Sequence, residues 1–584
     1  MQFFLLIFLF VPAILSASSI SYSVDFEGVD HEAILKTLHA VSGLRSNKKA
    51  PSSVNALRYR AESDVPEILK VLRAAGYYDA TVQMQIDNLG KEFQVKILIE
   101  QGTLYTIETF DVTMSYHGSS LICDEIELKK TGIKLGKPAV AQKILEAELL
   151  LMQQFSENGY PLATLSEREI LVDTKSKTVR IHLTVDTGPI AYFGEAMLQG
   201  DTKIAPRFVQ KKIAWKKEEL YDSRKIELTQ KKLMETGLFS SSLITHTHQT
   251  LSDQSLPLLI ELTDNKQRSV NLGASYQTFY GFGLTFGWEN RNINALGRTL
   301  SLQGDITKRT HAGLATYMIP DFKRTNQDFI NQLQAMYEAI TPYAMRSYNA
   351  VSRIERKVNE TWRFSCGGKI EKLYVSQSVE NGRFFLCELP LYLRRSSANS
   401  LLNPTEGMSI EYTMTPSLNV EKSPSGYLIQ KLCSSLYLPC TKSHRIVIAQ
   451  KVTLGSIASP HLNNVPVPKR FFGGSEEDLR GYRYQSVSQL KGNQPIGGRA
   501  ALYYTLETRF RLCEAIGLVP FLDLGRVYET ILPTLHGKWF KSVGLGVRYF
   551  SFLGPLRCDL AFPLDRRKEI DPYYRILLSI GQMF

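Results

Sequence analysis

The side chains of this sequence that are able to bind a metal ion or form a covalent bond are few and widely spaced. His246 and His248 lie two residues apart, so on an extended strand they share one face and could supply two ligands to a metal ion. A strand that merely carries two histidines is much more common. The seven cysteines include no Cys-x-x-Cys pair, which argues against a zinc site or a thioredoxin-type motif. We expect no metal site, and the spacing leaves open whether Cys433 and Cys440 pair in an oxidising compartment.

No motif for bond chemistry is present. The sequence has no Gly-x-Ser-x-Gly elbow, no Walker loop and no His-Glu-x-x-His pair, so we expect no catalytic residue and no cofactor. The most distinctive stretch runs from Arg470 to Tyr482, as Arg-Phe-Phe-Gly-Gly and, after four intervening residues, Leu-Arg-Gly-Tyr. Taken alone, Arg480 in this stretch is most simply a solvated loop arginine.

Length and charge indicate several domains next to an anionic surface. The chain has 584 residues, 43% hydrophobic and 22% charged, which is close to the composition of a soluble multidomain protein. Its net charge of +12 is spread along the chain. Because we find no basic helix and no aromatic platform, this charge favours a lipid headgroup surface over nucleic acid as the neighbour.

The N-terminus has the pattern of a secretory signal. Residues 3–15 are apolar apart from Pro12, and the small residues Ser16, Ala17 and Ser18 follow. We predict a signal peptide over 1–17, although the segment before the apolar run carries no Lys or Arg. A buried or anchoring helix is the alternative, but the run is too short to span a bilayer. Since no later segment reaches about 20 apolar residues, a membrane-spanning mature chain must be a closed β-barrel.

Three weak repeats fill the first half of the chain. In each, a helix ends at a glycine and a strand follows; the glycines Gly76, Gly159 and Gly237 are 83 and 78 residues apart (159 − 76 and 237 − 159). In the second copy we expect Leu145, Leu149 and Met152 to line the buried helix face. We predict small α+β domains over 18–104, 105–190 and 191–265. An unrelated α+β domain in triplicate is the alternative.

Period-two alternation dominates residues 266–584. Val270 and Leu272 alternate with polar or small neighbours, as do Tyr504 and Leu506 with Thr505 and Glu507, so that one face is apolar and the other carries charge. We count about sixteen candidate strands, an even number as bacterial barrels require. A soluble sandwich with its apolar face inward would show the same alternation.

Four stretches resemble the BamA/TamA superfamily of outer-membrane assembly factors. They are the stretch from Arg470 to Tyr482, Phe-Leu-Asp-Leu-Gly at 521–525, Gly-Pro-Leu-Arg-Cys-Asp-Leu-Ala at 554–561 and the terminal Ser-Ile-Gly-Gln-Met-Phe. The resemblance covers nearly the whole mature chain. It implies three polypeptide-transport-associated (POTRA) domains and a sixteen-stranded barrel, and the count of three favours the TamA branch. One departure is Leu479, where the family has Val or Ile.

The resemblance also implies a site. In the family, the loop folds into the barrel lumen and its arginine pairs with acidic groups on the wall. Here Arg480 is the arginine, with Asp523 and Asp559 as wall partners, Gly481 in the turn and Tyr482 against the wall. A guanidinium can bind two carboxylates through its forked donors. Without the resemblance, the two aspartates would be read as turn residues.

The function implied is assembly or translocation of outer-membrane proteins, above all autotransporter-type clients. A lateral seam would join the first strand, with Val270 and Leu272, to the last, with Ile580, Gly581 and Phe584, and a freed edge would template a client strand. The implied partners are unfolded clients, the lipid bilayer and a TamB-like subunit spanning from the inner membrane, docked on the first POTRA domain. The alternatives are a core BamA-type insertase, a two-partner secretion transporter, and a structural porin or adhesin barrel without clients.

Overall fold

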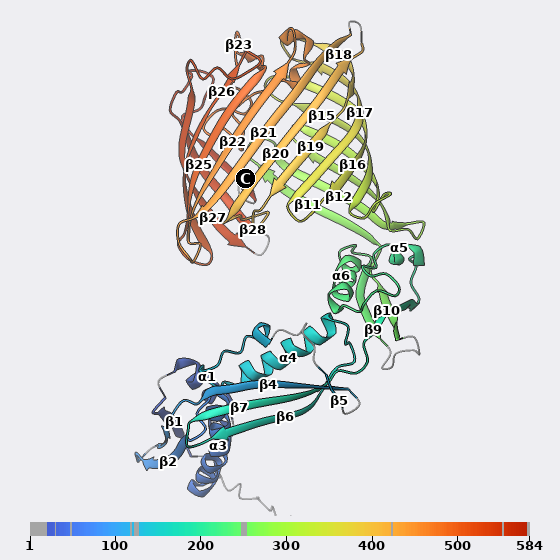
Figure 1. The fold of residues 1–584 in the computed structure, drawn as a ribbon. Helices are drawn as coiled ribbons and strands as arrows, with labels where there is room; N and C mark the ends of the chain where they lie inside the picture. Colours follow the sequence, from blue (N-terminus) through green and yellow to red (C-terminus); the bar gives the residue numbers. More distant parts are fainter. Residues whose placement is uncertain are drawn as a thin grey trace, which may run out of the picture. The chain divides into compact units, whose positions relative to one another are not determined.

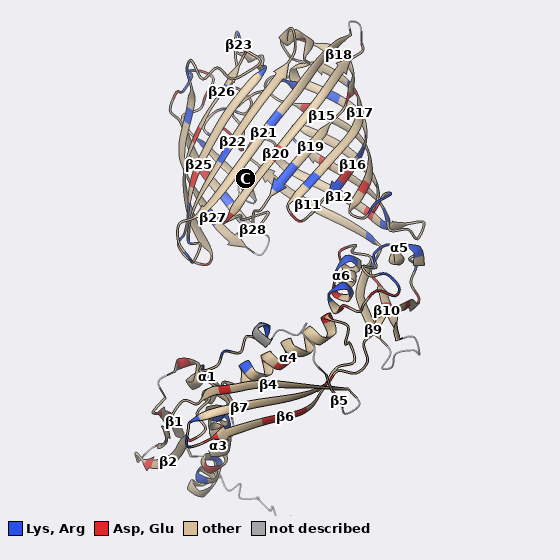
Figure 2. Ribbon diagram, viewed as in Figure 1, with Lys and Arg blue, Asp and Glu red and all other residues tan. Residues whose placement is uncertain are grey.

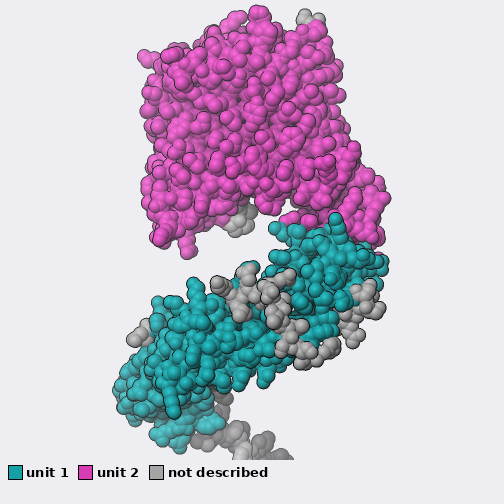
Figure 3. Space-filling view, viewed as in Figure 1, with its two compact units in different colours: residues 1–199, 213–231, 243–261 teal, residues 200–212, 232–242, 262–584 magenta. Residues whose placement is uncertain are grey.

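A computed structural model describes residues 20–580 apart from 30, 47–49, 91, 117–118, 122–127, 247–253, 422–423 and 552–553. The predicted signal peptide, His248, Gly581 and Phe584 lie outside the described residues. The chain divides into two compact units, one of residues 1–199, 213–231 and 243–261, the other of residues 200–212, 232–242 and 262–584 (Figure 3).

The first sheet of the N-terminal part has the order β1-β3-β2, with β1 (Tyr22–Glu27) parallel and β2 (Thr81–Asn88) antiparallel to β3 (Phe93–Glu100) (Figure 1). Three helices accompany it: α1 (Glu32–Val41), α2 (Gly43–Ser46) and α3 (Val54–Ala74). Ile68 and Leu72 of α3 pack in one core with Val95 and Ile97 of β3. Ile68 and Leu72, four residues apart, therefore lie on the buried face of this helix.

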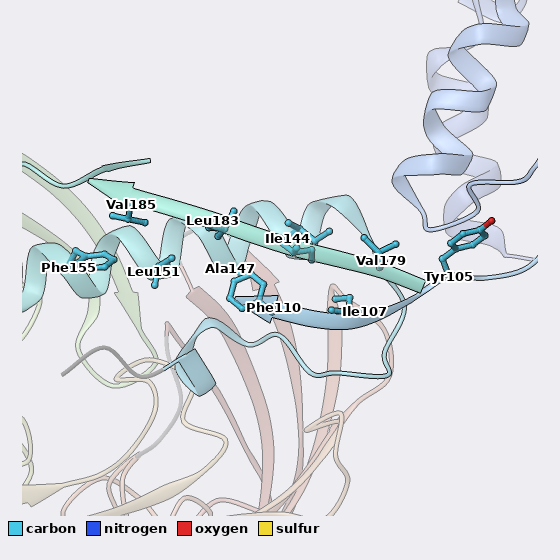
Figure 4. Packing of buried hydrophobic residues seen from close by; sticks show 12 residues of the cluster. Tyr105, Ile107, Phe110, Ile144, Ala147, Leu151, Phe155, Val179, Leu183 and Val185 are labelled. Carbon is cyan, nitrogen blue, oxygen red and sulfur yellow. The ribbon is translucent and has the colours of Figure 1, made fainter. Parts of the chain in front are cut away.

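The second sheet has the order β5-β4-β7-β6, formed by β4 (Thr106–Tyr116), β5 (Ser119–Leu121), β6 (Thr164–Asp173) and β7 (Thr178–Asp186). The 3₁₀ turn η1 (Leu128–Thr131) precedes α4 (Ala141–Glu157). Figure 4 shows Ile144, Ala147, Leu151 and Phe155 of α4 facing the sheet. The prediction that Leu145 and Leu149 line this face was wrong, because they are 45% and 71% exposed. The helix has apolar residues on two sides, and the sheet covers only one.

The third sheet has the order β8-β10-β9, from β8 (Tyr192–Gln199), β9 (Phe239–His246) and β10 (Ser255–Asp264), with the helices α5 (Pro206–Gln210) and α6 (Ser223–Met234). In all three repeats the predicted helix-ending glycine, Gly76, Gly159 or Gly237, has a positive φ, of 99°, 96° and 67°. Glycine adopts this left-handed conformation without a steric penalty. None of the described helices is long and apolar enough to cross a membrane.

The rest of the chain is one large antiparallel sheet. Its strands are β11 (Arg268–Gln277), β12 (Gly281–Ile293), β13 (Arg298–Thr307), β14 (Thr310–Ile319), β15 (Gln327–Ala339), β16 (Ala344–Lys357), β17 (Trp362–Ser376), β18 (Gly382–Glu388), β19 (Leu391–Ser396), β20 (Gly407–Asn419), β21 (Ser425–Pro439), β22 (Ile446–Ala458), β25 (Ala500–Arg511), β26 (Ile516–Tyr528), β27 (Phe540–Ser551), β28 (Gly554–Pro563) and β29 (Arg575–Ile580). Both β18 and β19 pair with β17 and with β20, so they form one strand interrupted at Leu389 and Pro390. The seventeen segments in the described residues thus make sixteen strands, and the predicted fold class is confirmed.

The two faces of this sheet are the reverse of those in a soluble sandwich. Ile370 and Leu560 are exposed on the outside, while their neighbours Glu371 and Asp559 are buried on the inside. Figure 2 shows the strands largely uncharged, with charged positions spaced along them. An apolar outer face and a polar interior are the pattern of a membrane barrel, so the sandwich alternative is wrong.

Candidate functional site: the lumen loop and the seam

A long loop, residues 459–499, connects β22 to β25 and folds into the barrel interior. It carries the short elements η2 (Leu462–Asn464), η3 (Val467–Lys469), β23 (Leu490–Lys491) and β24 (Gln494–Pro495). Leu479, Tyr482 and Val487 are fully buried in a cluster with Ala501 and Tyr503 of β25. The Asp478 carboxylate accepts from the backbone N–H groups of Gly474 and Ser475, both at 2.8 Å. This turn holds the loop tip in a fixed shape.

Arg480 lies at the loop tip with no exposed surface. Its Nε and Nη2 lie 3.0 and 2.7 Å from the two carboxylate oxygens of Asp523 on β26. Its Nη1 lies 3.0 Å from Asp559 on β28 and 2.9 Å from Glu507 on β25. The guanidinium also lies over the Phe521 ring, 3.4 Å from its centre. The structure thus brings together the predicted arginine and both predicted wall partners, and adds a third carboxylate.

Glu507 belongs to a wider network that the motif does not reveal. Arg509 donates to Glu507, and Arg557 donates to Asp559 at 2.7 Å. Arg548 also donates to Asp559. Four guanidinium groups and three carboxylates therefore share one buried cluster, in which each carboxylate contacts at least one guanidinium. The period-two pattern did assign Glu507 to the charged face, which was the available signal.

Gly481 is required by close approach, not by its backbone conformation. The Tyr482 N–H donates to the Leu479 carbonyl at 3.1 Å, so a tight turn is present. Gly481 is not among the residues with positive φ. A Cβ at this position would lie 2.7 Å from the Pro563 nitrogen and 2.9 Å from the Ser542 Cβ. The loop tip therefore lies against the wall at β27 and β28, where only glycine fits.

Tyr482 packs against the same part of the barrel wall. Its hydroxyl donates to the Lys541 carbonyl at 2.9 Å and accepts from the Asp565 N–H at 3.2 Å. Its ring meets Phe540 edge-on, 5.3 Å between ring centres. A buried tyrosine whose hydroxyl is satisfied in this way orients the loop as well as packing it.

A second ionic cluster binds the base of the loop to another part of the wall. Lys469 lies 2.6 Å from Glu371 on β17 and 3.4 Å from Glu388 on β18. Lys369 contacts the same two carboxylates, at 2.7 and 3.0 Å. Arg470 forms a two-pronged ion pair with Glu380. The loop is therefore held by charged contacts at both its base and its tip.

The seam between β11 and β29 is joined differently from other strand pairs. The Thr278 hydroxyl donates to the Ile576 carbonyl at 3.0 Å and accepts from the Leu578 N–H at 3.3 Å. Over the part of the barrel that the structure describes, no backbone ladder joins the two strands. Val270 and Leu272 of β11 are 61% and 81% exposed, and Ile580 is the last described residue of β29.

The other described side chains that could bind a metal ion or form a covalent bond do not come together in a site. His246 lies at the end of β9, with its ring edge-on to Tyr221. Within the described ranges, no group of three His, Cys, Asp or Glu residues is arranged to hold a metal ion. Cys433 and Cys440 are both free thiols.

Comparison with known proteins assigns the family. The Omp85 superfamily domain matches residues 268–584, which is 317 of 584 residues. The chain is 20% identical over 532 residues to outer membrane protein assembly factor BamA of Nitratidesulfovibrio vulgaris, covering 87% of this chain and 66% of that protein. It is 19% identical over 594 residues to the BamA of Neisseria meningitidis serogroup B, covering 89% and 72%.

One solved structure shares the fold over most of the chain. BamA from Haemophilus ducreyi lacking POTRA domains 1–3 superposes with a TM-score of 0.71 at 17% identity, covering 82% of this chain and all of that one. The chain spans just under two thirds of the length of the first curated relative. With the barrel, its inward loop and the small α+β domains preceding it, these matches show that the protein is an outer-membrane member of the Omp85 superfamily, with POTRA-type domains on the periplasmic side.

Proposed function

We propose that the protein assembles or translocates other outer-membrane proteins by pairing their strands with the free edge of β11. The observation that carries this proposal is the seam: its described hydrogen bonds run through one hydroxyl, that of Thr278. Every other neighbouring strand pair of the barrel is joined by a backbone ladder. An unpaired edge presents N–H and C=O groups that another strand can satisfy.

The environment makes strand pairing favourable. A backbone polar group without a partner costs several kcal/mol in hydrocarbon, as an order of magnitude. From Val270 to Gln277 every residue of β11 is exposed, so neither face of the strand is covered. A client strand added to β11 would satisfy these groups and enter the membrane already paired. Insertion is then driven by hydrogen bonding between strands, and no covalent bond is made or broken.

The finer assignment rests on the repeats and motifs. We propose POTRA domains over 18–104, 105–190 and 191–265, a cleaved signal over 1–17, autotransporter-type clients, and a TamB-like partner on the first domain, as in the TamA branch. The relatives named above are assembly factors called BamA, so a core insertase role is the alternative. A general loss of outer-membrane proteins on depletion would favour that alternative. A two-partner secretion transporter would instead require a single dedicated exoprotein.

A disulfide across the seam tests the mechanism. In a chain whose native cysteines are replaced by serine, Thr278→Cys combined with Leu577→Cys locks β11 to β29. We expect client assembly to stop on oxidation and to resume on reduction. As a control, Leu284→Cys with Ile306→Cys joins β12 to β13, which are already paired at these positions, and should leave assembly unchanged. Assembly at the normal rate with the seam fully locked would refute the proposal and favour a structural barrel.

A further inference from the structure

We propose that the lumen loop latches the seam from inside, with Tyr484 holding the first strand and Arg575 holding the last. The inference rests on the proposed function, because it assigns a closing device to the seam through which clients would pass. It concerns the backbone of the Arg-Gly-Tyr motif, which Arg575 contacts, and Tyr484, two residues beyond the motif.

The first edge of the seam is held by aromatic contacts. Phe279, two residues after β11, stacks on Tyr484 with 3.9 Å between ring centres and 18° between planes. The hydroxyls of Tyr280 and Tyr484 lie 2.9 Å apart, and Tyr280 donates to Glu338 at 3.1 Å. The Arg309 guanidinium lies 4.5 Å from the centre of the Phe279 ring and its Nε donates to the Phe279 carbonyl. The turn after β11 is thus fastened to the loop.

The second edge is held by a charged side chain. Arg575, the first residue of β29, donates through Nη1 to the carbonyl oxygens of Arg480, at 3.2 Å, and of Tyr482. The loop residues from Arg480 to Tyr484 therefore contact both edges of the seam. Their proximity along the chain means that the two edges cannot separate widely while both contacts persist.

The two contacts differ in strength. On the β29 side, Arg575 binds a stretch that Arg480 fixes to Asp523 and Asp559 through charged hydrogen bonds. On the β11 side, the contacts to Tyr484 are all uncharged: a ring stack with Phe279, an edge-on ring contact with Tyr280 and one hydrogen bond between hydroxyls. Charged hydrogen bonds are roughly twice as strong as neutral ones. Opening should therefore begin at Tyr484, with the first hairpin leaving and the loop staying with the last strands.

A cavity of about 500 Å³ borders this contact and leaves space for the change. Its lining includes Phe279, Tyr280, Tyr484 and Gln485 from the latch, with Tyr503 from the wall. The Tyr503 hydroxyl and the Gln485 amide oxygen are buried and lack a hydrogen-bond partner among the described residues. Polar groups next to Tyr484 are therefore incompletely hydrogen-bonded.

Spin-label distances across the seam test the latch without any client. Labels at Phe286→Cys on β12 and Leu560→Cys on β28 report seam width in the full chain, reconstituted in lipid vesicles after serine replacement of the native cysteines. Tyr484→Ala should increase the separated population about tenfold and lengthen the distances, because it removes a ring stack and a hydrogen bond. Tyr484→Phe keeps the stack and should give a smaller shift.

A matched control removes a tyrosine elsewhere in the wall. Tyr392 lies on β19, and Tyr392→Ala should leave the distances unchanged. Phe279→Ala gives a second route if Tyr484→Ala does not fold, and it should widen the seam as well. Unchanged distances in a folded Tyr484→Ala or Phe279→Ala chain would overturn the latch. The two failures are distinguishable. Unchanged spin-label distances would contradict the latch, whereas client assembly with a disulfide-locked seam would contradict the proposed function.

Discussion

Arg480 and Asp523 form a fully buried, two-pronged ion pair, with Nη2 to Oδ1 at 2.7 Å and Nε to Oδ2 at 3.0 Å. The Arg480 backbone N–H and the Ser542 hydroxyl also donate to Oδ2 of Asp523. One carboxylate on β26 thus fixes both the side chain and the backbone of the loop tip. Its neutralisation should release the tip.

Asp523→Asn should cost about 3–5 kcal/mol of unfolding free energy, because it leaves a buried guanidinium without its main partner. Denaturant titration of the detergent-solubilised chain, followed by heat-modifiable gel mobility, measures the loss. Arg480→Lys should also be destabilised, since an ammonium cannot donate two parallel hydrogen bonds to one carboxylate.

The control for this prediction is a half-exposed ion pair. Arg394 and Glu411 lie 3.2 Å apart with side chains 27% and 40% exposed. Glu411→Gln should cost no more than about 1 kcal/mol. Equal losses for Asp523→Asn and Glu411→Gln would contradict a special role for the Arg480 cluster.

Gly481→Ala should displace the loop tip without changing any charge. The added Cβ would meet the backbone at Phe562 and Pro563 at 2.9 and 2.7 Å. Overpacking of this kind costs about 1–3 kcal/mol. Increased hydrogen exchange in residues 478–484 is the expected readout. Gly313→Ala on β14, where the Cβ would enter open space, is the matched control; equal exchange in both variants would contradict the close fit.

The contact between Asp79 and Lys177 should make the first two N-terminal domains sensitive to acid. The Lys177 ammonium lies 2.8 Å from Asp79, and this hydrogen bond lowers the pKa of the Asp79 carboxyl below its ordinary value. Because the folded-state pKa is lowered, the contact is fully formed above the ordinary carboxyl pKa of about 3.9. It is lost as the pH falls through the lower, folded-state value.

Spin labels at Lys70→Cys on α3 and Gln153→Cys on α4 measure this contact in the full chain. We expect a narrow distance distribution at neutral pH that broadens below about pH 4. Asp79→Asn should give the broad distribution at every pH. A narrow distribution in Asp79→Asn at neutral pH would show that contacts other than Asp79–Lys177 hold the two domains together.

The sequence predicted the elements with strong periodicity and missed contacts that depend on distant folding. Alternation and length predicted about sixteen strands. The interruption at Leu389 and Pro390 does not change that number, because the segments on its two sides pair with the same neighbouring strands. The face of α4 was misassigned because Leu145 and Leu149 give the helix a second apolar side, and only tertiary packing selects between the sides.

The site shows the same division. Arg480, Asp523 and Asp559 were named through family motifs, and alternation assigned Glu507 to the charged face. Tyr484 and Arg575 carry no such signal. They meet the loop and the seam only after the barrel has closed, because the contacts of Arg575 with the loop join residues 93 and 95 apart in sequence.

The base of the lumen loop has a mechanical consequence. Lys469 and Arg470 tie it to β17, β18 and the connection between them, and Arg480 ties its tip to β25, β26 and β28. The loop therefore crosses the lumen as a brace and should stiffen the barrel between β17–β18 on one side and β25–β28 on the other. The barrel should deform most easily at the strands that the loop contacts only through uncharged side chains. The first hairpin, at Phe279 and Tyr280, is such a place.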